Sequence, residues 1–332
     1  MMDGAKEAHN TVHVYRTSPK TLKADIGRIL TSPESRPLDS RKETFVKINA
    51  NYDRIWPGCN TSKWFLEALF KNLRDLGFDD IKVIEGDLKL QPATRTVQMT
   101  EIDKVLARYG VEFVPVEQLD RENELPTFLK GSQLISTPVL HTHTFAVISV
   151  AAKNLYGLLP VYREKYHKIL SQKLLDLTER IKVFSIVDGT VGLEGGSMRM
   201  GTPIRTDLIL AGWDPVAVDV IAAKIMGFSE NEVPYLKLAR IEGRIGSIDI
   251  GGDFSQTDLP RFNFHFSESR LSNIDLWLRG NRLTGSLFDY DKTLDRLANR
   301  VRRRYTHAVY RRRKERVSVG LWREYEELRA GE

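Results

Sequence analysis

Segments typical of strands and of helices alternate through the middle of this 332-residue chain, and this alternation limits its fold more than any other feature. Residues 44–50 have the β-branched and apolar content of a strand. Apolar side chains then recur at helical spacing over residues 61–76, and Gly77 follows where such a helix would end. Strands and helices in repeated succession are typical of βαβ units, whose strands run parallel. We therefore predict an α/β fold with a mainly parallel sheet flanked by helices.

The alternation continues to residue 227, and its last unit carries the most complete local signals. Asp214 is a preferred helix N-cap residue, Pro215 suits the first helical position, and Gly227 suits the C-terminal stop. The other elements are predicted from apolar runs and periodicity, with strands at 80–84, 111–116, 133–140, 183–187 and 207–211, and helices at 101–109, 162–182 and 216–226.

The two ends of the chain lack this alternation. Residues 1–41 are polar, with scattered Ser, Pro and Lys, and are interpreted as an N-terminal arm outside the core. Residues 42–254 form the predicted α/β domain, and residues 255–332 form a C-terminal extension. Apolar side chains from Leu294 to Ala308 trace one face of a helix, so this extension is predicted to contain a basic amphipathic helix.

Basic residues are concentrated in that predicted helix. The formal net charge is +6, but residues 300–316 hold nine Arg or Lys and one Glu, which leaves 41 basic against 43 acidic residues elsewhere. Such a helix suits an anionic membrane surface or a nucleic-acid backbone, or else it packs on the body with its arginines in water. The residues expected to contact an anionic partner are Arg302, Arg303, Arg304, Arg311, Arg312 and Arg313.

Cys59 is the single cysteine of the chain, and this excludes several classes of protein. One cysteine cannot form an intramolecular disulfide framework, a cysteine-ligated iron–sulfur cluster or a zinc ribbon. The N-terminus lacks an apolar signal core, and the longest uncharged apolar run, residues 145–152, is far shorter than the roughly 20 residues of a transmembrane helix. We therefore expect a soluble cytoplasmic protein, peripheral at a membrane if the basic segment binds one.

Two histidines stand at the end of the predicted strand at 133–140. Because strand side chains alternate between faces, His141 and His143 point the same way, and His167 is a third imidazole from the following segment. This H-x-H spacing can present imidazoles to one divalent metal ion or to one anion. Alternatively, His143 caps the strand end by hydrogen bonding while His141 and His167 lie on the surface. The sequence leaves both interpretations open.

A lysine–asparagine pair provides a second candidate site. Lys153 offers a positive charge and Asn154 offers a paired donor and acceptor, and both precede a turn at Gly157. Such a pair can bind a carboxylate or a phosphate. Taken alone, the same residues also fit an ordinary helix end.

A glycine-rich segment, residues 188–203, provides the third candidate site. It follows a predicted buried strand, where the backbone of open α/β sheets turns N–H groups toward an anion. We expect it to be a long loop that lines a ligand cleft. Asp188 and Glu194 would serve there as general base or metal ligand, and Arg199 would hold an anion.

Several motifs, in the right order, resemble the large microbial family catalogued as domain of unknown function 362. That family has a Lys-Pro-Asn strand end, a Gly-Asp strand end, P-x-L-K-T-H, K-N-x-x-G, a Tyr-His pair, D-G-x-x-G-x-E-G, and D-P-V-A-x-D before a Met-Gly helix end. The resemblance covers residues 42–254 and implies the family's fold, with the polar motif residues at strand ends and in loops. The matching segments are residues 47–49, 86–87, 138–143, 153–157, 166–167, 188–195, 214–219 and 226–227.

The sequence departs from this pattern at several positions. His141 replaces the lysine of K-T-H, Ile48 replaces the proline after Lys47, and residues 195–198 replace a G-x-G-P stretch. The ferredoxin-like cluster segment of many members is absent. The change at position 141 either removes the family's activity or shifts the site toward metal binding.

We expect an enzyme that acts on a small anionic metabolite in a cleft lined by residues 137–157 and 188–203, with a divalent metal ion as an optional cofactor. The alternative is a non-catalytic ligand-binding or scaffold protein that docks on an anionic membrane or nucleic acid through its basic helix. The residues do not indicate a reaction type. The predicted catalytic residues are His143, Lys153, Asp188 and Glu194, the predicted substrate-binding residues are Lys47, Asn49, Asn154 and Arg199, and the predicted metal ligands are His141, His143 and His167.

Overall fold

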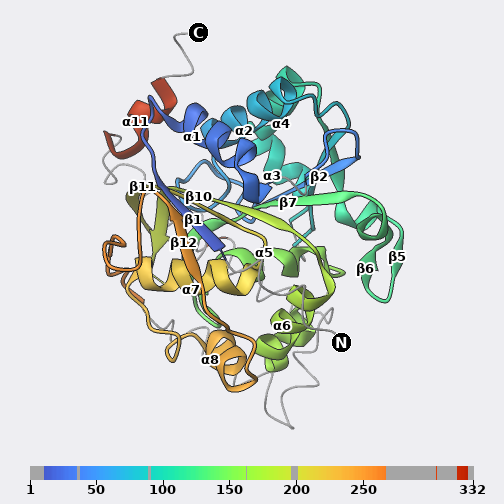
Figure 1. The fold of residues 1–332 in the computed structure, drawn as a ribbon. Helices are drawn as coiled ribbons and strands as arrows, with labels where there is room; N and C mark the ends of the chain where they lie inside the picture. Colours follow the sequence, from blue (N-terminus) through green and yellow to red (C-terminus); the bar gives the residue numbers. More distant parts are fainter. Residues whose placement is uncertain are drawn as a thin grey trace.

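The structure, a computed structural model, describes residues 11–35, 38–88, 91–161, 163–195, 201–266, 304 and 320–327. Its centre is a 10-stranded mixed sheet in the order β12-β1-β11-β10-β7-β2-β3-β4, with β8 paired to β10 and β9 paired to β8 (Figure 1). The strands are β1 (Thr11–Arg16), β2 (Thr44–Ile48), β3 (Ile81–Glu85), β4 (Glu112–Pro115), β7 (Gln133–Thr137), β8 (Val139–His143), β9 (Val147–Ser149), β10 (Phe184–Glu194), β11 (Thr202–Gly212) and β12 (Asp249–Gly252), and β5 (Arg121–Glu122) pairs separately with β6 (Leu125–Pro126).

Parallel pairing dominates the half of the sheet that surrounds β2, as the βαβ pattern predicts. β2 is followed outward by β3 and β4 on one side and by β7 and β10 on the other, and all four pairings are parallel. The chain fills β3 and β4 first and then crosses to the other side of β2, so the strand order reverses between β2 and β7. In open α/β sheets, ligands bind outside the carboxyl ends of the strands at such a reversal.

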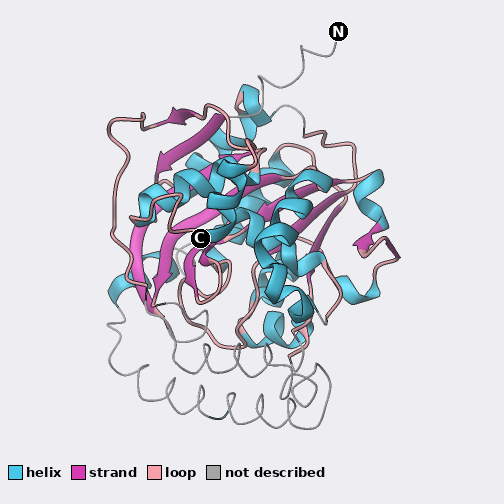
Figure 2. Ribbon diagram, turned by 90° about the horizontal axis from the view of Figure 1, so that it is seen from below, coloured by secondary structure: helices cyan, strands magenta, loops and turns pink. Residues whose placement is uncertain are grey.

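Helices cover both faces of the sheet (Figures 1 and 2). The apolar stripes of α1 to α4 pack on one face and those of α5 to α8 pack on the other, which gives two main hydrophobic clusters. The predicted α/β class is therefore confirmed. The helices are α1 (Leu22–Thr31), α2 (Lys63–Asp75), α3 (Ala93–Met99), α4 (Ile102–Arg108), α5 (Ala151–Leu155), α6 (Leu170–Arg180), α7 (Pro215–Met226), α8 (Pro234–Ile241) and α11 (Gly320–Glu327).

The local signals around α7 are confirmed in detail. The Asp214 carboxylate accepts a hydrogen bond from the Val216 N–H at 2.8 Å, and Pro215 occupies the first helical position. Gly227 ends the helix with φ of +94°, in the left-handed region that favours glycine. These signals succeed because each cap depends on residues only a few positions apart.

The N-terminal segment is part of the core, so its interpretation as an arm outside the core is wrong for the described residues. β1 lies inside the sheet, antiparallel to β11 and parallel to β12. α1 packs against α2 and buries Ile26 and Ile29 completely. The segment is polar in overall composition, but its few apolar residues recur at the spacing that one strand and one helix need to bury one side.

Three predicted strands have clearly different bounds in the structure, and the one expected at 207–211 is the longer β11, Thr202–Gly212. The single strand expected at 133–140 is two strands, β7 and β8, because Pro138 lacks the N–H that a continuous ladder requires. The strand expected at 183–187 continues as β10 to Glu194 and pairs antiparallel with β11. Consequently, much of the glycine-rich segment expected to be a long loop is a strand pair, with an irregularity between Gly189 and Val191.

The helix expected at 162–182 is α-helical only over α6. Residues Arg163–Ile169 form a 3-10 helix instead. The Tyr156 hydroxyl donates a hydrogen bond to the Arg163 carbonyl. This bond competes with the α-helical hydrogen bond that the Arg163 carbonyl would otherwise accept at the start of the segment.

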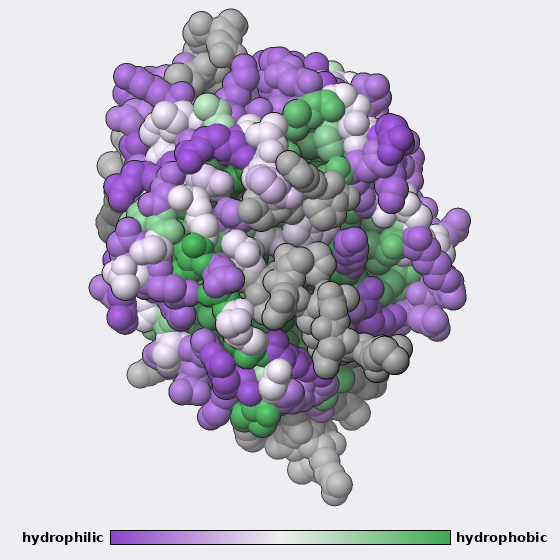
Figure 3. Space-filling model, in the orientation of Figure 1, coloured by the Kyte–Doolittle hydropathy of each residue, from purple (hydrophilic) through white to green (hydrophobic). Residues whose placement is uncertain are grey.

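The described C-terminal helix, α11, packs on the body beside α2. Tyr325 is buried, its ring stacks on Trp64 at 5.5 Å, and its hydroxyl donates to Asp207 at 2.6 Å. The predicted basic helix of residues 300–316 lies outside the described residues except for Arg304, which is helical and exposed. Hydrophilic residues cover much of the face in Figure 3, with separate hydrophobic patches. Among the described residues, no helix has both the length and the apolar character needed to cross a membrane.

Candidate functional site

Polar residues gather at the carboxyl edge of the sheet, where the strand order reverses. Lys47 is the penultimate residue of β2 and Asn49 follows that strand, while Glu85 ends β3. Parallel register places Lys47 beside Ser136 of β7. The candidate site is therefore built where an open α/β sheet of this order is expected to bind a ligand.

Lys47 and Glu85 form a buried ion pair at the centre of this edge. Lys47 Nζ lies 2.6 Å from Glu85 Oε1, and each side chain is only 1% exposed. Nζ also donates to the Ile48 carbonyl at 2.7 Å, while the Glu85 carboxylate accepts the N–H groups of Ala50 and Gly86, each at 2.8 Å. Burial lowers the pKa of Lys47, and the charge of Glu85 opposes this effect. The ammonium predicted to bind substrate is therefore engaged with protein atoms.

Asn154 ties α5 to the ends of β2 and β7. Its Nδ2 donates to the Lys47 carbonyl at 3.2 Å and to Ser136 Oγ at 2.9 Å. Its Oδ1 lies 3.4 Å from Lys47 Nζ. These contacts fix α5 against the sheet edge, and they fix with it the neighbouring residue, Lys153.

Asn49 connects the end of β2 to β8. Its backbone N–H donates to Thr61 Oγ1 at 2.9 Å, and its Nδ2 donates to the Cys59 carbonyl at 3.3 Å. The same Nδ2 lies 3.5 Å from Nε2 of His141. The structure thus brings two predicted site residues, Asn49 and His141, into contact.

His141 is a buried neutral imidazole whose Nε2 accepts a hydrogen bond from the Asn49 amide at 3.5 Å. Its Nδ1 lies 3.2 Å from the Thr142 carbonyl, and because a carbonyl can only accept, Nδ1 carries the proton. Nε2 therefore keeps its lone pair. Burial lowers the pKa of His141 to about 4, with the charge of Lys153 acting in the same direction and the bond to Thr142 opposing it. The alternative expectation that His141 lies on the surface is wrong, since its side chain is buried.

His143 holds the opposite tautomer. Its Nδ1 accepts the backbone N–H groups of Phe145 at 3.1 Å and Ala146 at 3.4 Å, so Nε2 carries the proton. This is the strand-end hydrogen bonding expected as the alternative to a metal site. Burial, followed by the charge of Lys153, lowers the pKa of His143 well below its ordinary value.

Lys153 and His167 complete a group of basic side chains. Lys153 lowers the pKa of both strand histidines, and His167 contributes to the lowering at His143. Lys153 Nζ lies 4.6 Å from the centre of the Tyr156 ring, and the His167 ring stacks on the same tyrosine at 6.3 Å. We call the four residues His141, His143, Lys153 and His167 the basic cluster.

The donor atoms of the basic cluster do not fit a metal ion. His143 uses its Nδ1 lone pair for backbone N–H groups, so Nε2 would have to lose its proton before it could bind a metal. Among the described residues, no group of three or more His, Cys, Asp or Glu side chains is arranged to hold a metal ion. The chemistry of these donors instead suits an anion, which pairs with Lys153 and with imidazole N–H groups.

Asp188, a predicted catalytic residue, caps α2. Its carboxylate accepts four hydrogen bonds, from the N–H and hydroxyl of Ser62 at 2.8 and 2.6 Å and from the N–H and hydroxyl of Thr190 at 3.2 and 2.7 Å. Burial raises the pKa of Asp188, and these bonds oppose that rise. The contacts give Asp188 a structural role at the start of α2, and its catalytic role stays a prediction.

Glu194 lies at the end of β10 and fixes a segment from the C-terminal side of the domain. Its Oε2 accepts the backbone N–H of His265 at 2.6 Å, and the Gly195 N–H donates to the His265 carbonyl at 2.8 Å. These contacts do not involve the basic cluster. Arg199 lies outside the described residues.

Two residues of the site were missed by sequence reasoning. Glu85 had a partial signal, since it directly follows the strand predicted at 80–84 and an acidic residue buried there requires a partner. Ser136 stood inside a predicted strand and had no distinguishing signal. Glu85 pairs with Lys47, and Ser136 accepts a hydrogen bond from Asn154, only once β2, β3 and β7 lie side by side in the sheet.

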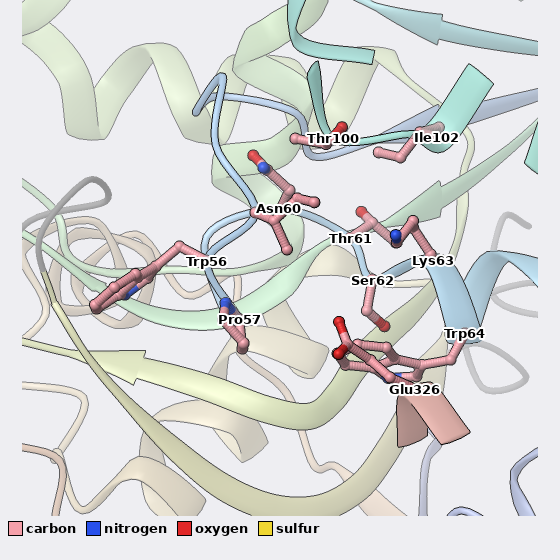
Figure 4. A pocket seen from close by; sticks show the side chains of 11 residues that line it. Trp56, Pro57, Asn60, Thr61, Ser62, Lys63, Trp64, Thr100, Ile102 and Glu326 are labelled. Atoms are coloured by element: carbon pink, nitrogen blue, oxygen red, sulfur yellow. The ribbon is translucent and has the colours of Figure 1, made fainter. Parts of the chain in front are cut away.

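A separate pocket opens at the N-terminus of α2 (Figure 4). Its empty volume is about 390 Å³, which includes open solvent. Two of its hydroxyl groups are engaged in the protein, since Thr61 donates to the Thr137 carbonyl and Ser62 to Asp188, each at 2.6 Å. Its lining residues, which include no predicted site residue, are Ile55, Trp56, Pro57, Asn60, Thr61, Ser62, Lys63, Trp64, Thr100, Ile102 and Glu326.

Comparison with known proteins gives a family match. The family model described as Domain of unknown function (DUF362) matches residues 44–224, which include β2, the basic cluster, β10 and most of α7. No curated protein and no solved structure matches the chain.

Proposed function

This chain belongs to the family described as Domain of unknown function (DUF362), and we propose that it is an enzyme that acts on a small anionic metabolite at the basic cluster. The family description assigns no reaction, so the proposal depends on the contacts of the site. The observation that carries it is a pair of buried neutral imidazoles with opposite tautomers, His141 and His143, beside the charge of Lys153.

The charges of the cluster favour an anionic ligand. Burial and the positive charge of Lys153 both oppose protonation of His141 and His143. A bound carboxylate or phosphate would pair with Lys153 and would stabilise the protonated form of either imidazole. By reciprocity, anion binding and proton uptake favour each other, so affinity should rise as the pH falls.

The two imidazoles suit proton transfer. Their positions, two residues apart on β8, direct both side chains to the same face of the strand. Nε2 of His141 can accept a proton from the substrate, and Nε2–H of His143 can donate a hydrogen bond to the oxygen on which negative charge develops. Asn49, next to His141 Nε2, would orient that ring.

Anion binding is tested by calorimetry with sulfate, whose charge stays constant between pH 5 and 8. We expect Lys153→Ala to weaken sulfate binding about tenfold or more, because the substitution removes the charge of the cluster. Lys224→Ala, which removes an exposed lysine of α7, is the matched control and should change nothing. Equal affinity in both variants, or an affinity that falls as the pH is lowered, would contradict the proposal.

Proton transfer is tested by deuterium exchange into a panel of small carboxylates in D₂O, followed by NMR. The wild type should exchange the acidic C–H hydrogen of its substrate class, and His141→Asn should lose exchange while it retains sulfate binding. Sulfate binding without exchange into any carboxylate would favour the non-catalytic alternative, a ligand-binding protein.

A further inference from the structure

Asp219 of α7 contacts the start of α5, the helix that carries Lys153 and Asn154. Its Oδ1 accepts the Ala151 N–H at 2.6 Å and its Oδ2 accepts the Ala152 N–H at 3.0 Å. The side chain is completely buried. Both oxygens of one carboxylate therefore bind the first turn of a neighbouring helix.

A third hydrogen bond fixes this carboxylate in place. The Tyr235 hydroxyl of α8 donates to Oδ2 at 2.7 Å, and Tyr235 is itself buried. Burial raises the pKa of Asp219 to about 7, and the three donors oppose that rise. The titratable groups that face Asp219 are Tyr235 and, across the start of α7, Asp214. A buried carboxylate is costly, so its position indicates a specific role for its contacts.

α5 depends on this outside cap because it cannot supply its own. The helix spans only five residues, Ala151–Leu155, and its N-cap residue, Val150, makes no side-chain cap hydrogen bond. Helices of this length do not form alone, and the N–H groups of their first turn need acceptors. Asp219 supplies these acceptors and adds a negative charge at the positive end of the helix.

We propose that Asp219 is a positioning residue, which fixes α5 and thereby places Lys153 in the basic cluster and Asn154 against the sheet edge. The proposal deepens the proposed function and rests on it for the role of Lys153. The path consists of contacts between named atoms, from the Asp219 carboxylate to the α5 N–H groups, and from Asn154 to Lys47 and Ser136. Asp219 itself touches no basic-cluster side chain in these contacts, so its effect on a ligand would act through α5.

The first experiment measures backbone hydrogen exchange. In Asp219→Asn, the amide that replaces one oxygen points an N–H group at an N–H of α5, so amides 151–155 should exchange at least about tenfold faster, while those of α6 keep their wild-type rates. Asp75→Asn, at an exposed ion pair with Lys71 in α2, is the control and should leave amides 151–155 unchanged. Wild-type exchange of α5 in Asp219→Asn would overturn the proposal.

The second experiment measures sulfate affinity in a double-mutant cycle. Asp219→Asn should weaken sulfate binding about tenfold in the wild-type background and less than about twofold in the Lys153→Ala background, because both changes remove the same lysine from the site. Fully additive losses would overturn the proposal. If Asp219→Asn does not fold, Asp219→Ser, which removes the carboxylate that accepts the Ala151 and Ala152 N–H groups, takes its place in both experiments. If the wild type binds no sulfate, the proposed function fails, and the exchange rates of α5 alone decide the role of Asp219.

Discussion

Glu85→Gln should destabilise this protein strongly, because it removes the charge that balances a buried ammonium. Lys47 and Glu85 are each 1% exposed and lie 2.6 Å apart, so water cannot take the place of the lost partner. Removal of one partner from a buried ion pair costs about 3–5 kcal/mol of unfolding free energy. The glutamine also turns an N–H group toward the backbone N–H groups that donate hydrogen bonds to Glu85, which further lowers the free energy of unfolding.

The matched control is Glu43→Gln, at an ion pair of the same residue types beside the same two strands. Glu43 lies 2.5 Å from Lys82 Nζ, but these side chains are 31% and 32% exposed. Because water reaches this partly exposed pair, it contributes about 0–1 kcal/mol, so Glu43→Gln should have a small effect. Urea unfolding monitored by circular dichroism measures both variants.

Two further outcomes test the electrostatic cause. Burial lowers the pKa of Lys47 in the folded state, so the Glu85→Gln variant gains stability as the pH rises toward 10.5. The difference in unfolding free energy between this variant and the wild type should therefore shrink. Adding Lys47→Met removes the unpaired ammonium, so the double variant should be more stable than Glu85→Gln alone. A deficit below about 1 kcal/mol, or additive losses in the double variant, would refute the reasoning.

Three other predictions each concern one side chain. Asp188→Asn should lower the free energy of unfolding in urea by about 2 kcal/mol and leave sulfate affinity unchanged, because the four hydrogen bonds of Asp188 cap α2. Normal stability with lost deuterium-exchange activity would instead support the predicted catalytic role of Asp188. Burial raises the pKa of Asp219 from 3.8 to about 7. As the pH rises between these values, the free energy of unfolding of the wild type should therefore fall by about 4 kcal/mol relative to that of Asp219→Asn. A difference in unfolding free energy that stays constant with pH would contradict this. Tyr325→Ala should speed proteolytic cleavage at residues 320–327, because it removes the stack on Trp64 and the bond to Asp207; cleavage at the wild-type rate would show that other contacts hold α11.

Much of the parallel half of the sheet could be predicted from the sequence. The runs that became β2, β3, β4 and β7 were recognisable because each contains a short stretch of apolar and β-branched residues. The caps of α7 were readable because Asp214 and Gly227 act within a few residues of their partners. The family motifs also located Lys47, Asn49 and Asn154, which lie near the reversal of strand order, but not their partners.

Other features depended on residues that lie far apart in the sequence. The cap of α2 comes from Asp188, 126 residues after Ser62, and no local pattern indicates such a pair. The ion pair of Lys47 and Glu85 joins two strands, and its burial depends on how closely those strands and α5 pack. The N-terminal strand β1 joins the sheet beside β11 and β12, which come much later in the chain.

The sequence by itself determined the α/β class, the capped helix α7 and several polar residues near the reversal of strand order, because periodicity and capping act over a few residues. Only the tertiary structure decided what each polar atom does. It assigned opposite tautomers to His141 and His143, paired Lys47 with Glu85, and placed Asp219 at the start of α5. The physical reason is that a buried polar group takes its role from the partners that satisfy it, and those partners are brought together by packing.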